Sequence, residues 1–277
     1  MSYDLIIGEC DNEQLSISPE DQLKHTIIFD HTSSESRKLT LSILEQKIAC
    51  GEGLIFIQGD ENELENQFKD LLSSANKLDL LVPINNDSES LNLPDLKNLI
   101  ITIVTQSKIA YVNFAGISKL TNTRLFIQAF SESIEELRHM GGSRRYKQCN
   151  VVTTNLECIQ SRHWMKLMNF ARVCNIALIN SVGSFERFVD LDGTLGQMYQ
   201  TIYSIFEGSH NRILFSQVDY RTNIEFSRFA EVRNYELTKN GVIRSKKSFK
   251  NDNVIFHKLT RQQFVLLNGD LLNIVNI

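Results

Sequence analysis

Apolar and polar residues alternate along this chain in a pattern that predicts strands and helices in turn. A β-branched apolar run at 25–29 is followed by small polar residues at 32–36, and then by apolar positions at helical spacing within 39–48. Two glycines end that helix, and the apolar run at 54–57 predicts a second buried strand. A strand–helix–strand unit of this length predicts two parallel strands joined by a right-handed crossover.

The same alternation continues through most of the chain. Further strands are predicted at 4–8, 78–85, 109–114, 151–154, 176–179 and 213–218. Further helices are predicted at 61–76, 120–140, 163–170, 195–206 and 219–229. Pro94 starts a helix or a turn that leads into the apolar run at 99–104. These elements favour an α/β protein with a parallel sheet.

The last part of the chain predicts antiparallel strands and a basic loop in place of the strand–helix alternation. Apolar runs at 254–256 and 264–267 predict antiparallel strands at the sheet edge, with the Asn268-Gly269 pair as a hairpin turn. The segment 239–250 carries several basic residues and is predicted to be an exposed, mobile loop.

The loop after the first core strand is where a nucleoside triphosphate would bind in this architecture. A phosphate-binding loop needs glycines whose backbone N–H groups surround the phosphates, then a Lys and a Ser or Thr for the γ-phosphate and Mg²⁺. The residues here are Asp30, His31, Thr32, Ser33, Ser34, Glu35, Ser36 and Arg37. The run has no glycine, Ser36 stands at the lysine position, and Asp30 and Glu35 would repel phosphate charge. We therefore expect no ATP and no other cofactor at this loop.

Around this loop the sequence resembles the coupling ATPases of type IV secretion and conjugation, especially their TraD-like and DotL-like (Dot/Icm) branch. The run DQLKHTIIF at 21–29 is similar to the lead-in of the family block D-L-x-R-H-M-x-V-x-G-T-T-G-x-G-K-T. GEGLIFIQGD at 51–60 is similar to the next family strand, LDLLVPIN at 78–85 to its D-D-L-L-x-I-N, and KIAYVNF at 108–114 to a later strand.

The resemblance also places the other catalytic motifs of the family. Family members end a strand with an Asp-Glu pair, and an Ala-Arg dipeptide follows farther along. Ala171-Arg172 is present here, so counting back puts Thr154 and Asn155 at the acidic pair. The glutamine that senses the γ-phosphate would fall at Gly183. The resemblance thus implies a core that has lost all three catalytic motifs.

For the whole chain, 1–277, the resemblance implies one RecA-like P-loop NTPase-type domain. Its three-layer core would hold a mostly parallel sheet with helices on both faces and an antiparallel edge. Family members also carry membrane-spanning helices and a helical domain inserted after the strand that ends near residue 85. A short polar loop at 85–95 stands at that place here, so we expect both the inserted domain and the membrane anchor to be absent.

The composition and net charge of the chain exclude some classes of function. The chain has 277 residues, 42% of them hydrophobic and 22% charged, which is typical of a globular protein. A net charge of -4 argues against a surface that tracks DNA, because phosphate binding needs concentrated Lys and Arg. Five cysteines without a Cys-x-x-Cys motif favour free thiols in a reducing cytosol and no metal site.

Two further features allow two interpretations each. The basic residues at 144–147 could dock an acidic partner or lie in a solvated loop. Trp164 could be an anchor inside the protein or a contact for a partner.

The favoured hypothesis is a non-catalytic pseudo-ATPase that acts as an adaptor or structural subunit of a bacterial type IV secretion coupling complex and helps to recruit effectors. Its partners would be the coupling ATPase or its adaptors, in the cytoplasm or at the inner membrane through those subunits. One alternative is a nucleotide-binding protein or ATPase in which Arg37, Lys38 and the N–H groups of a helix start still bind phosphate. Another is a DNA-binding accessory factor of conjugation, which the acidic composition disfavours.

Overall fold

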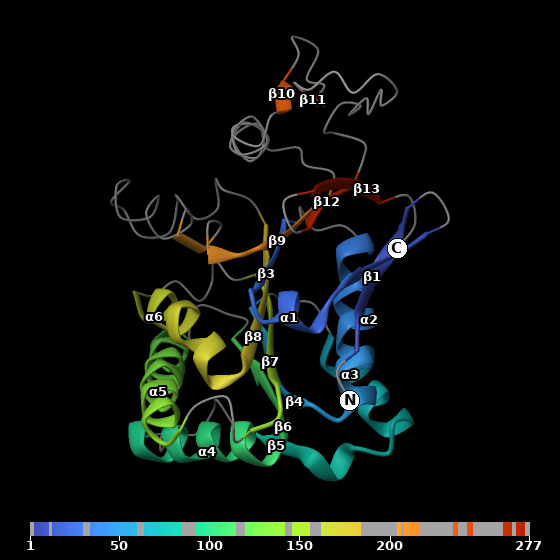
Figure 1. The fold of residues 1–277 in the computed structure, drawn as a ribbon. Helices are drawn as coiled ribbons and strands as arrows, with labels where there is room; N and C mark the ends of the chain where they lie inside the picture. Colours follow the sequence, from blue (N-terminus) through green and yellow to red (C-terminus); the bar gives the residue numbers. More distant parts are fainter. Residues whose placement is uncertain are drawn as a thin grey trace.

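The protein is built around one large sheet with helices on both faces (Figure 1). The structure, a computed structural model, describes residues 3–10, 13–29, 34–59, 64–84, 92–114, 120–141, 146–155, 162–183, 204–205, 208–215, 235–237, 243–245, 263–267 and 270–274. The sheet has nine strands in the order β13-β12-β9-β3-β8-β7-β4-β6-β5.

Seven neighbouring strands of this sheet are parallel. They are β3 (Thr26–Phe29), β4 (Gly53–Gln58), β5 (Leu81–Pro83), β6 (Ile109–Asn113), β7 (Cys149–Thr154), β8 (Ile176–Val182) and β9 (Asn211–Leu214). Two antiparallel strands, β12 (Gln263–Leu267) and β13 (Asp270–Ile274), continue the sheet beyond β9. The predicted mostly parallel sheet with an antiparallel edge is confirmed.

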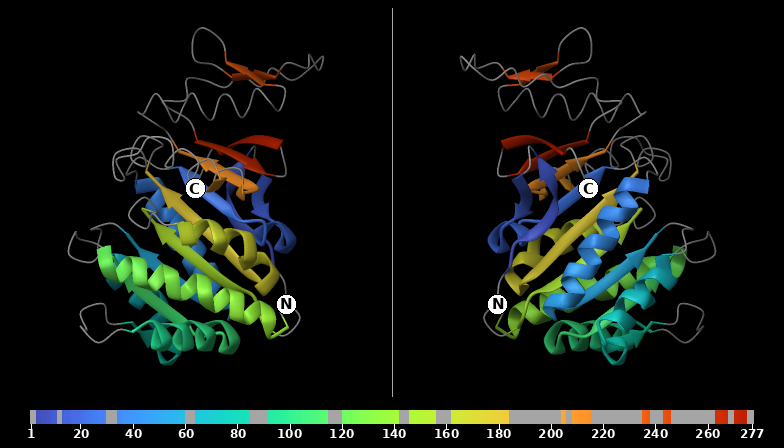
Figure 2. Two further views of the ribbon diagram at one scale, coloured as in Figure 1. Left: turned by 90° about the vertical axis from the view of Figure 1, so that its left-hand side faces the viewer. Right: turned by 90° about the vertical axis from the view of Figure 1, so that its right-hand side faces the viewer.

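Five longer helices cover the two faces of the sheet (Figure 2). One face carries α2 (Ser34–Cys50) and α3 (Leu64–Ser74), and the other carries α4 (Leu93–Gln106), α5 (Leu120–His139) and α6 (Arg162–Ala171). Shorter helical turns are α1 (Pro19–Gln22), η1 (Leu78–Leu80) and η5 (Arg172–Cys174). This arrangement confirms the predicted three layers.

Successive strand residues point to opposite faces and so build two separate cores. Ile55 and Ile57 pack in the core shared with α4, α5 and α6, whereas Leu54 and Phe56 pack in the core shared with α2 and α3. Trp164 is 1% exposed and belongs to the first of these cores, so it is an internal anchor. Because the strands are apolar on both faces, they read as continuous apolar runs in the sequence.

The segment after Pro94 is a single helix, α4, of 14 residues. Asn92 caps its start by accepting a hydrogen bond from the N–H of Asp95, and Pro94 occupies the first turn, where no N–H is needed. Ser107, in the left-handed conformation, ends it. The apolar run at 99–104 is therefore the inner part of a helix.

Two small hairpins lie outside the main sheet. At the start of the chain β1 (Leu5–Cys10) pairs with β2 (Glu13–Ile17), and Leu5, Ile7 and Ile17 join the core of α2 and α3. Near the end β10 (Tyr235–Leu237) pairs with β11 (Ile243–Ser245). The prediction of a mobile loop across 239–250 is therefore wrong for 243–245, where backbone pairing overrides the charged composition.

Several predicted elements cannot be compared in full. The helix at 195–206 is described only at 204–205, where the chain is helical, and the segments 219–229 and 254–256 lie outside the described residues, as do 144–145 of the basic cluster. The strand expected at 213–218 is observed as β9, two residues earlier. None of the described helices is long and apolar enough to cross a membrane.

His25 ties three elements together just before β3. Its Nε2–H donates to the carbonyl oxygen of Met168 (2.9 Å), and its Nδ1 accepts a hydrogen bond from the N–H of Leu178 (3.2 Å). Only the neutral ring can do both, since a protonated ring carries two donors. Burial lowers the pKa of His25 to about 4, the Met168 bond raises it in part, and the charge of Arg172 lowers it further.

This hydrogen-bonded histidine predicts a loss of stability in acid. The unfolded chain binds a proton at His25 near pH 6.5, but the folded protein resists it down to about pH 4. The free energy of unfolding should therefore fall as pH drops through this window, by about 3 kcal/mol in total. His25→Asn, which tolerates the positive φ of this position, should be less stable at pH 7 and lose this part of the pH slope.

Urea unfolding at pH 7, 5.5 and 4.5 gives the free energy of unfolding at each pH. Its slope against pH is then compared between the wild type and His25→Asn. His139→Asn is the matched control because His139 is exposed at the end of α5. It should keep the wild-type slope. Equal slopes for all three proteins would contradict the role assigned to His25.

Candidate functional site

The candidate site is the edge of the sheet where the parallel strands end. Helix α2, which follows β3, packs on one face, while α6, which follows β7, packs on the other. The connections after β3 and β7 therefore leave the sheet toward opposite faces, with β8 between these two strands. In open α/β sheets ligands bind outside the carboxyl ends of the strands.

The predicted phosphate loop joins β3 to α2 at this edge. Asp30, His31, Thr32 and Ser33 lie outside the described residues, as do the side chains of Ser34 and Glu35. In the first turns of α2 Ser36 is buried, whereas Arg37 and Lys38 are exposed. Ser36, at the position of the family's lysine, is thus buried in the protein, whereas Arg37 and Lys38 are exposed to solvent.

Thr154 and Asn155, at the positions of the family's acidic pair, hold two strand ends together. The N–H of Gly59 donates to the carbonyl oxygen of Thr154 (3.0 Å), and the Thr154 hydroxyl oxygen lies 3.3 Å from the same nitrogen. Asn155, at a φ of 53°, donates its side-chain amide to the carbonyl oxygen of Gly59 (3.4 Å). Both residues therefore join the end of β7 to the end of β4.

Only glycine fits at position 59. A Cβ there would lie 2.6 Å from the carbonyl oxygen of Thr154 and 2.7 Å from that of Asn155. Both contacts are with backbone atoms, which cannot rotate away. The sequence comparison singled out Thr154 and Asn155 but not Gly59, although a glycine directly after a strand signals a close backbone approach.

The described ends of the parallel strands carry no charged side chain. The residues that end the seven parallel strands, and the residues that follow them, are Phe29, Gln58, Gly59, Pro83, Ile84, Asn113, Phe114, Thr154, Asn155, Val182, Gly183, Leu214 and Phe215. None of them is acidic or basic. No carboxylate among them could hold Mg²⁺ or activate water, and no cation could pair with a phosphate.

Buried ionisable groups lie at the opposite, amino edge instead. Lys47, in the last turn of α2, is fully buried, and burial lowers its pKa. Its Nζ donates to Oε1 of Gln22, lies 3.3 Å from a carboxylate oxygen of Glu52, and sits 5.0 Å from the centre of the Tyr3 ring. Burial and the charge of Glu52 raise the pKa of Tyr3. Sequence reasoning missed Lys47, although it lies four residues after Ile43 and so on the apolar face of the helix.

The described cysteines are free thiols. Burial raises the pKa of Cys149 to about 12 and that of Cys174 to about 11, so both are unreactive, while Cys50 is exposed. No cluster of three or more His, Cys, Asp or Glu side chains that could hold a metal ion occurs among the residues that the structure describes.

No family model matches the sequence, and no curated protein matches it either. Solved structures of similar fold include the bacterial conjugative coupling protein TrwB, lacking its first 70 residues, with a TM-score of 0.61 at 8% identity over 94% of this chain and 86% of that chain. TrwB in complex with the non-hydrolysable ATP analogue ADPNP gives 0.61 at 7% identity over 96% and 88%.

VirB4 of Thermoanaerobacter pseudethanolicus is a further structure of similar fold, with a TM-score of 0.59 at 8% identity over 99% of this chain and 96% of that chain. At such low sequence identity, these structural similarities establish the fold alone. They confirm the predicted RecA-like P-loop NTPase architecture, the one found in type IV coupling and secretion proteins.

The close contact at Gly59 predicts a specific loss of stability. In Gly59→Ala the new methyl group would collide with two backbone oxygens, so the free energy of unfolding should fall by about 1–3 kcal/mol. Gly208→Ala is the matched control, because its Cβ would meet only the flexible end of Met168 at 3.2 Å. It should change the stability by less than about 0.5 kcal/mol. Chemical denaturation measures both, and equal losses would contradict the contact.

Proposed function

We propose that this protein is a non-catalytic pseudo-ATPase that serves as an adaptor or structural subunit of a bacterial type IV secretion coupling complex. The observation that carries the proposal is that the described strand ends at the carboxyl edge bear no charged side chain, in a sheet whose fold is similar to that of coupling proteins. TrwB has been solved with ADP and Mg²⁺ and with non-hydrolysable analogues of ATP and GTP. The fold is similar, but the described strand ends of this chain offer no carboxylate for Mg²⁺ and no cation for a phosphate.

Electrostatics supports the absence of catalysis. A bound triphosphate brings several negative charges that a lysine, Mg²⁺ and its ligands must balance. In the loop sequence Asp30 and Glu35 add negative charge, and Ser36, at the lysine position, is buried. Thr154 and Asn155 are engaged with Gly59, so they do not orient water. These features of the loop and of the described strand ends support a fold that is retained without hydrolysis.

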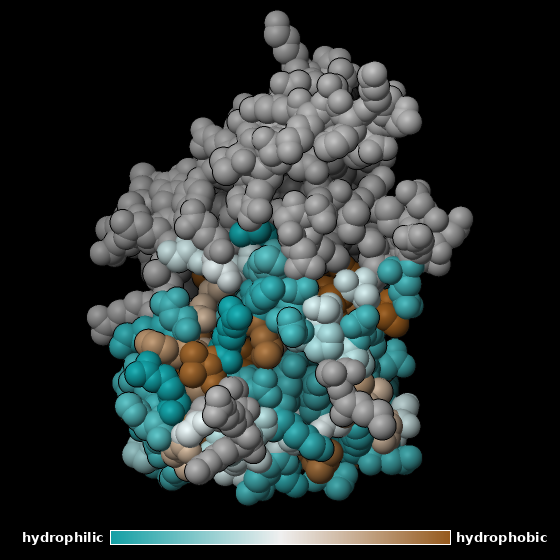
Figure 3. All heavy atoms as spheres, viewed as in Figure 1, coloured by the Kyte–Doolittle hydropathy of each residue, from teal (hydrophilic) through white to brown (hydrophobic). Residues whose placement is uncertain are grey.

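The surface supports a polar, reversible protein interface. The face drawn in Figure 3 is mainly hydrophilic in its described part, with separate apolar patches. Large exposed apolar side chains among the described residues are Ile6, Leu78, Met140 and Val173, from four different segments. Such scattered apolar residues fit a non-obligate interface better than a permanent one.

The partner we propose is the coupling ATPase or one of its adaptors on the cytoplasmic side of the secretion system. The sequence resemblance to the DotL-like branch points to a complex of the Dot/Icm type, in which this chain would assist effector translocation as an accessory subunit of the kind represented by DotZ. The loop expected at 85–95 is shorter, because α4 already begins at Leu93. The short polar sequence before α4 would stand where the ATPase itself carries its helical domain.

Mg-ATP titration tests the first half of the proposal. Calorimetric titration of the wild type with Mg-ATP should show no saturable binding at the loop. A coupled assay of ATP hydrolysis should show no turnover. The competing function is nucleotide binding through Arg37 and Lys38, which are exposed in the first turns of α2. Micromolar binding that is lost in the double variant Arg37→Ala/Lys38→Ala, but not in the control Lys69→Ala, an exposed residue of α3, would establish that alternative instead.

Affinity purification from the native bacterium tests the second half. The tagged protein should co-purify with a coupling ATPase or its adaptors, identified by mass spectrometry. Because a polar interface is weakened by salt, recovery should fall between low and high ionic strength. Recovery of neither class of protein at low salt, from cells that express the secretion system, would contradict the adaptor role.

A further inference from the structure

Helix α6 and the helical turn η5 that follows it contain no acidic residue. Their sequence, 162–174, holds several basic residues but neither Asp nor Glu. Trp164, Leu167 and Met168 pack in the core, which leaves an outward side of α6 and η5 toward solvent. We call this side, together with the neighbouring arginine of α5, the α6 face. It consists of Arg138, Lys166, Asn169, Phe170, Arg172 and Val173, of which only Phe170 is half-buried and the others are exposed.

Arg138, near the end of α5, packs against this face. Its guanidinium carbon lies 4.9 Å from the centre of the Phe170 ring. It makes no ion pair with any residue that the structure describes. The neighbouring carboxylates of α5 face lysines instead: Glu135 lies 3.9 Å from Lys166 Nζ and Glu136 lies 3.6 Å from Lys97 Nζ. An aromatic ring therefore holds the Arg138 side chain in place while its charge stays available.

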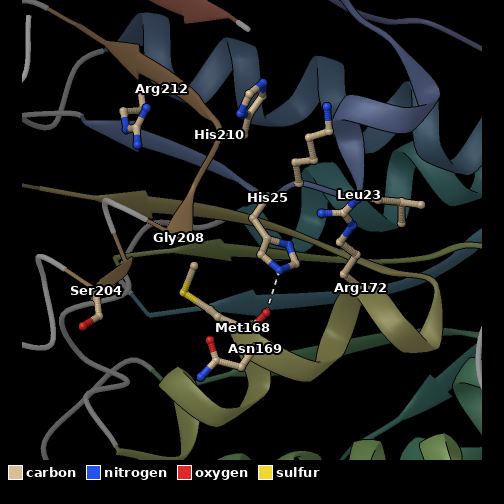
Figure 4. Close-up of a pocket in the computed structure, with 10 residues that line it drawn as sticks. Leu23, His25, Met168, Asn169, Arg172, Ser204, Gly208, His210 and Arg212 are labelled. Carbon is tan, nitrogen blue, oxygen red and sulfur yellow. Dashed lines mark hydrogen bonds between the residues drawn. The ribbon is translucent and has the colours of Figure 1, made fainter. Parts of the chain in front are cut away.

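Arg172, the first residue of η5, is a second available cation. Its side chain makes no hydrogen bond or ion pair with any residue within the described ranges. Figure 4 shows it extending from the end of α6, beside a cavity of about 500 Å³ that it helps to line. The α6 face thus presents two guanidinium groups from different elements.

An exposed apolar side chain lies between these two arginines. Val173 is 48% exposed, although it is a valine on a well-packed helical element. It follows Phe170 by three residues, so the two side chains share one side of the helix. Arg138 contacts the Phe170 ring, and Arg172 directly precedes Val173 in the chain. Arginines beside an accessible apolar side chain are typical of protein–protein interfaces, in which Arg is enriched.

We propose that the α6 face docks an acidic amphipathic helix of a partner protein. Two carboxylates of that helix would pair with Arg138 and Arg172 in the bidentate geometry that suits guanidinium groups, and an apolar side chain between them would cover Val173. The pairing needs only these two charges, so it does not depend on the net charge of the wider surface. Nucleic acid fits less well, because a phosphate backbone would leave Val173 uncovered. The docking rests on the proposed function only in placing the partner within a coupling complex.

Site-specific photo-crosslinking in the native bacterium tests this docking. Val173→p-benzoylphenylalanine in the full chain should crosslink to a protein segment of helical apolar periodicity in which Asp and Glu outnumber Lys and Arg, as mapped by mass spectrometry. Adding Arg138→Gln or Arg172→Gln should lower the yield of this product at least fivefold. Both side chains are exposed and lie on different elements, so each variant tests the docking independently. Lys69→Gln, on α3 across the sheet, is the matched control and should leave the yield unchanged.

Three results would overturn the docking. They are the absence of a crosslinked product, a crosslink to nucleic acid or to a segment without an acidic excess, and equal yields with and without the two arginines. An acidic helix from a protein outside any secretion system would support the docking but contradict the proposed function. Co-purification of a coupling ATPase together with any of the three results would support the proposed function and exclude the α6 face as its interface.

Discussion

The contact between Gly59 and the end of β7 determines the character of the carboxyl edge. Two backbone oxygens lie so near the Gly59 Cα that no side chain fits, and the Thr154 carbonyl together with the Asn155 amide satisfies the Gly59 backbone. Neutral hydrogen bonds thus join the ends of β4 and β7 at this edge. Because buried polar groups must be paired, Thr154 and Asn155 serve the packing of strands here.

Ionisable side chains are gathered at the other end of the same strands. Lys47, Glu52 and Tyr3 form a buried group beside the start of β4, and His25 lies beside Lys24 and Arg172 just before β3. Burial of Lys47 costs hydration of its charge, and the nearby Glu52 carboxylate, Gln22 amide oxygen and Tyr3 ring offset part of that cost. Among the described residues, the two ends of the strands therefore differ sharply in polarity.

Sequence patterns predicted the core well because each core element lies within one continuous run. The apolar strands, α2, α5 and the antiparallel edge followed directly from periodicity and glycine positions, whereas the placement of Thr154 and Asn155 at the acidic pair came from the resemblance to coupling ATPases. Contacts between distant segments were not accessible in the same way. Residues 24, 172 and 212 line one cavity, and the pairing that makes 243–245 a strand depends on β10 rather than on local composition.

The two edges of the sheet can change independently because the stability of the fold comes from elsewhere. Ile27 and Phe29 pack against the helices on one face of β3 and Ile28 against those on the other, so the strand is held along its length and not at its ends. The side chains at the ends of the strands can therefore vary without opening either core. A sheet held in this way is a rigid support, and the chemistry at its edges is set by residues that its stability does not require.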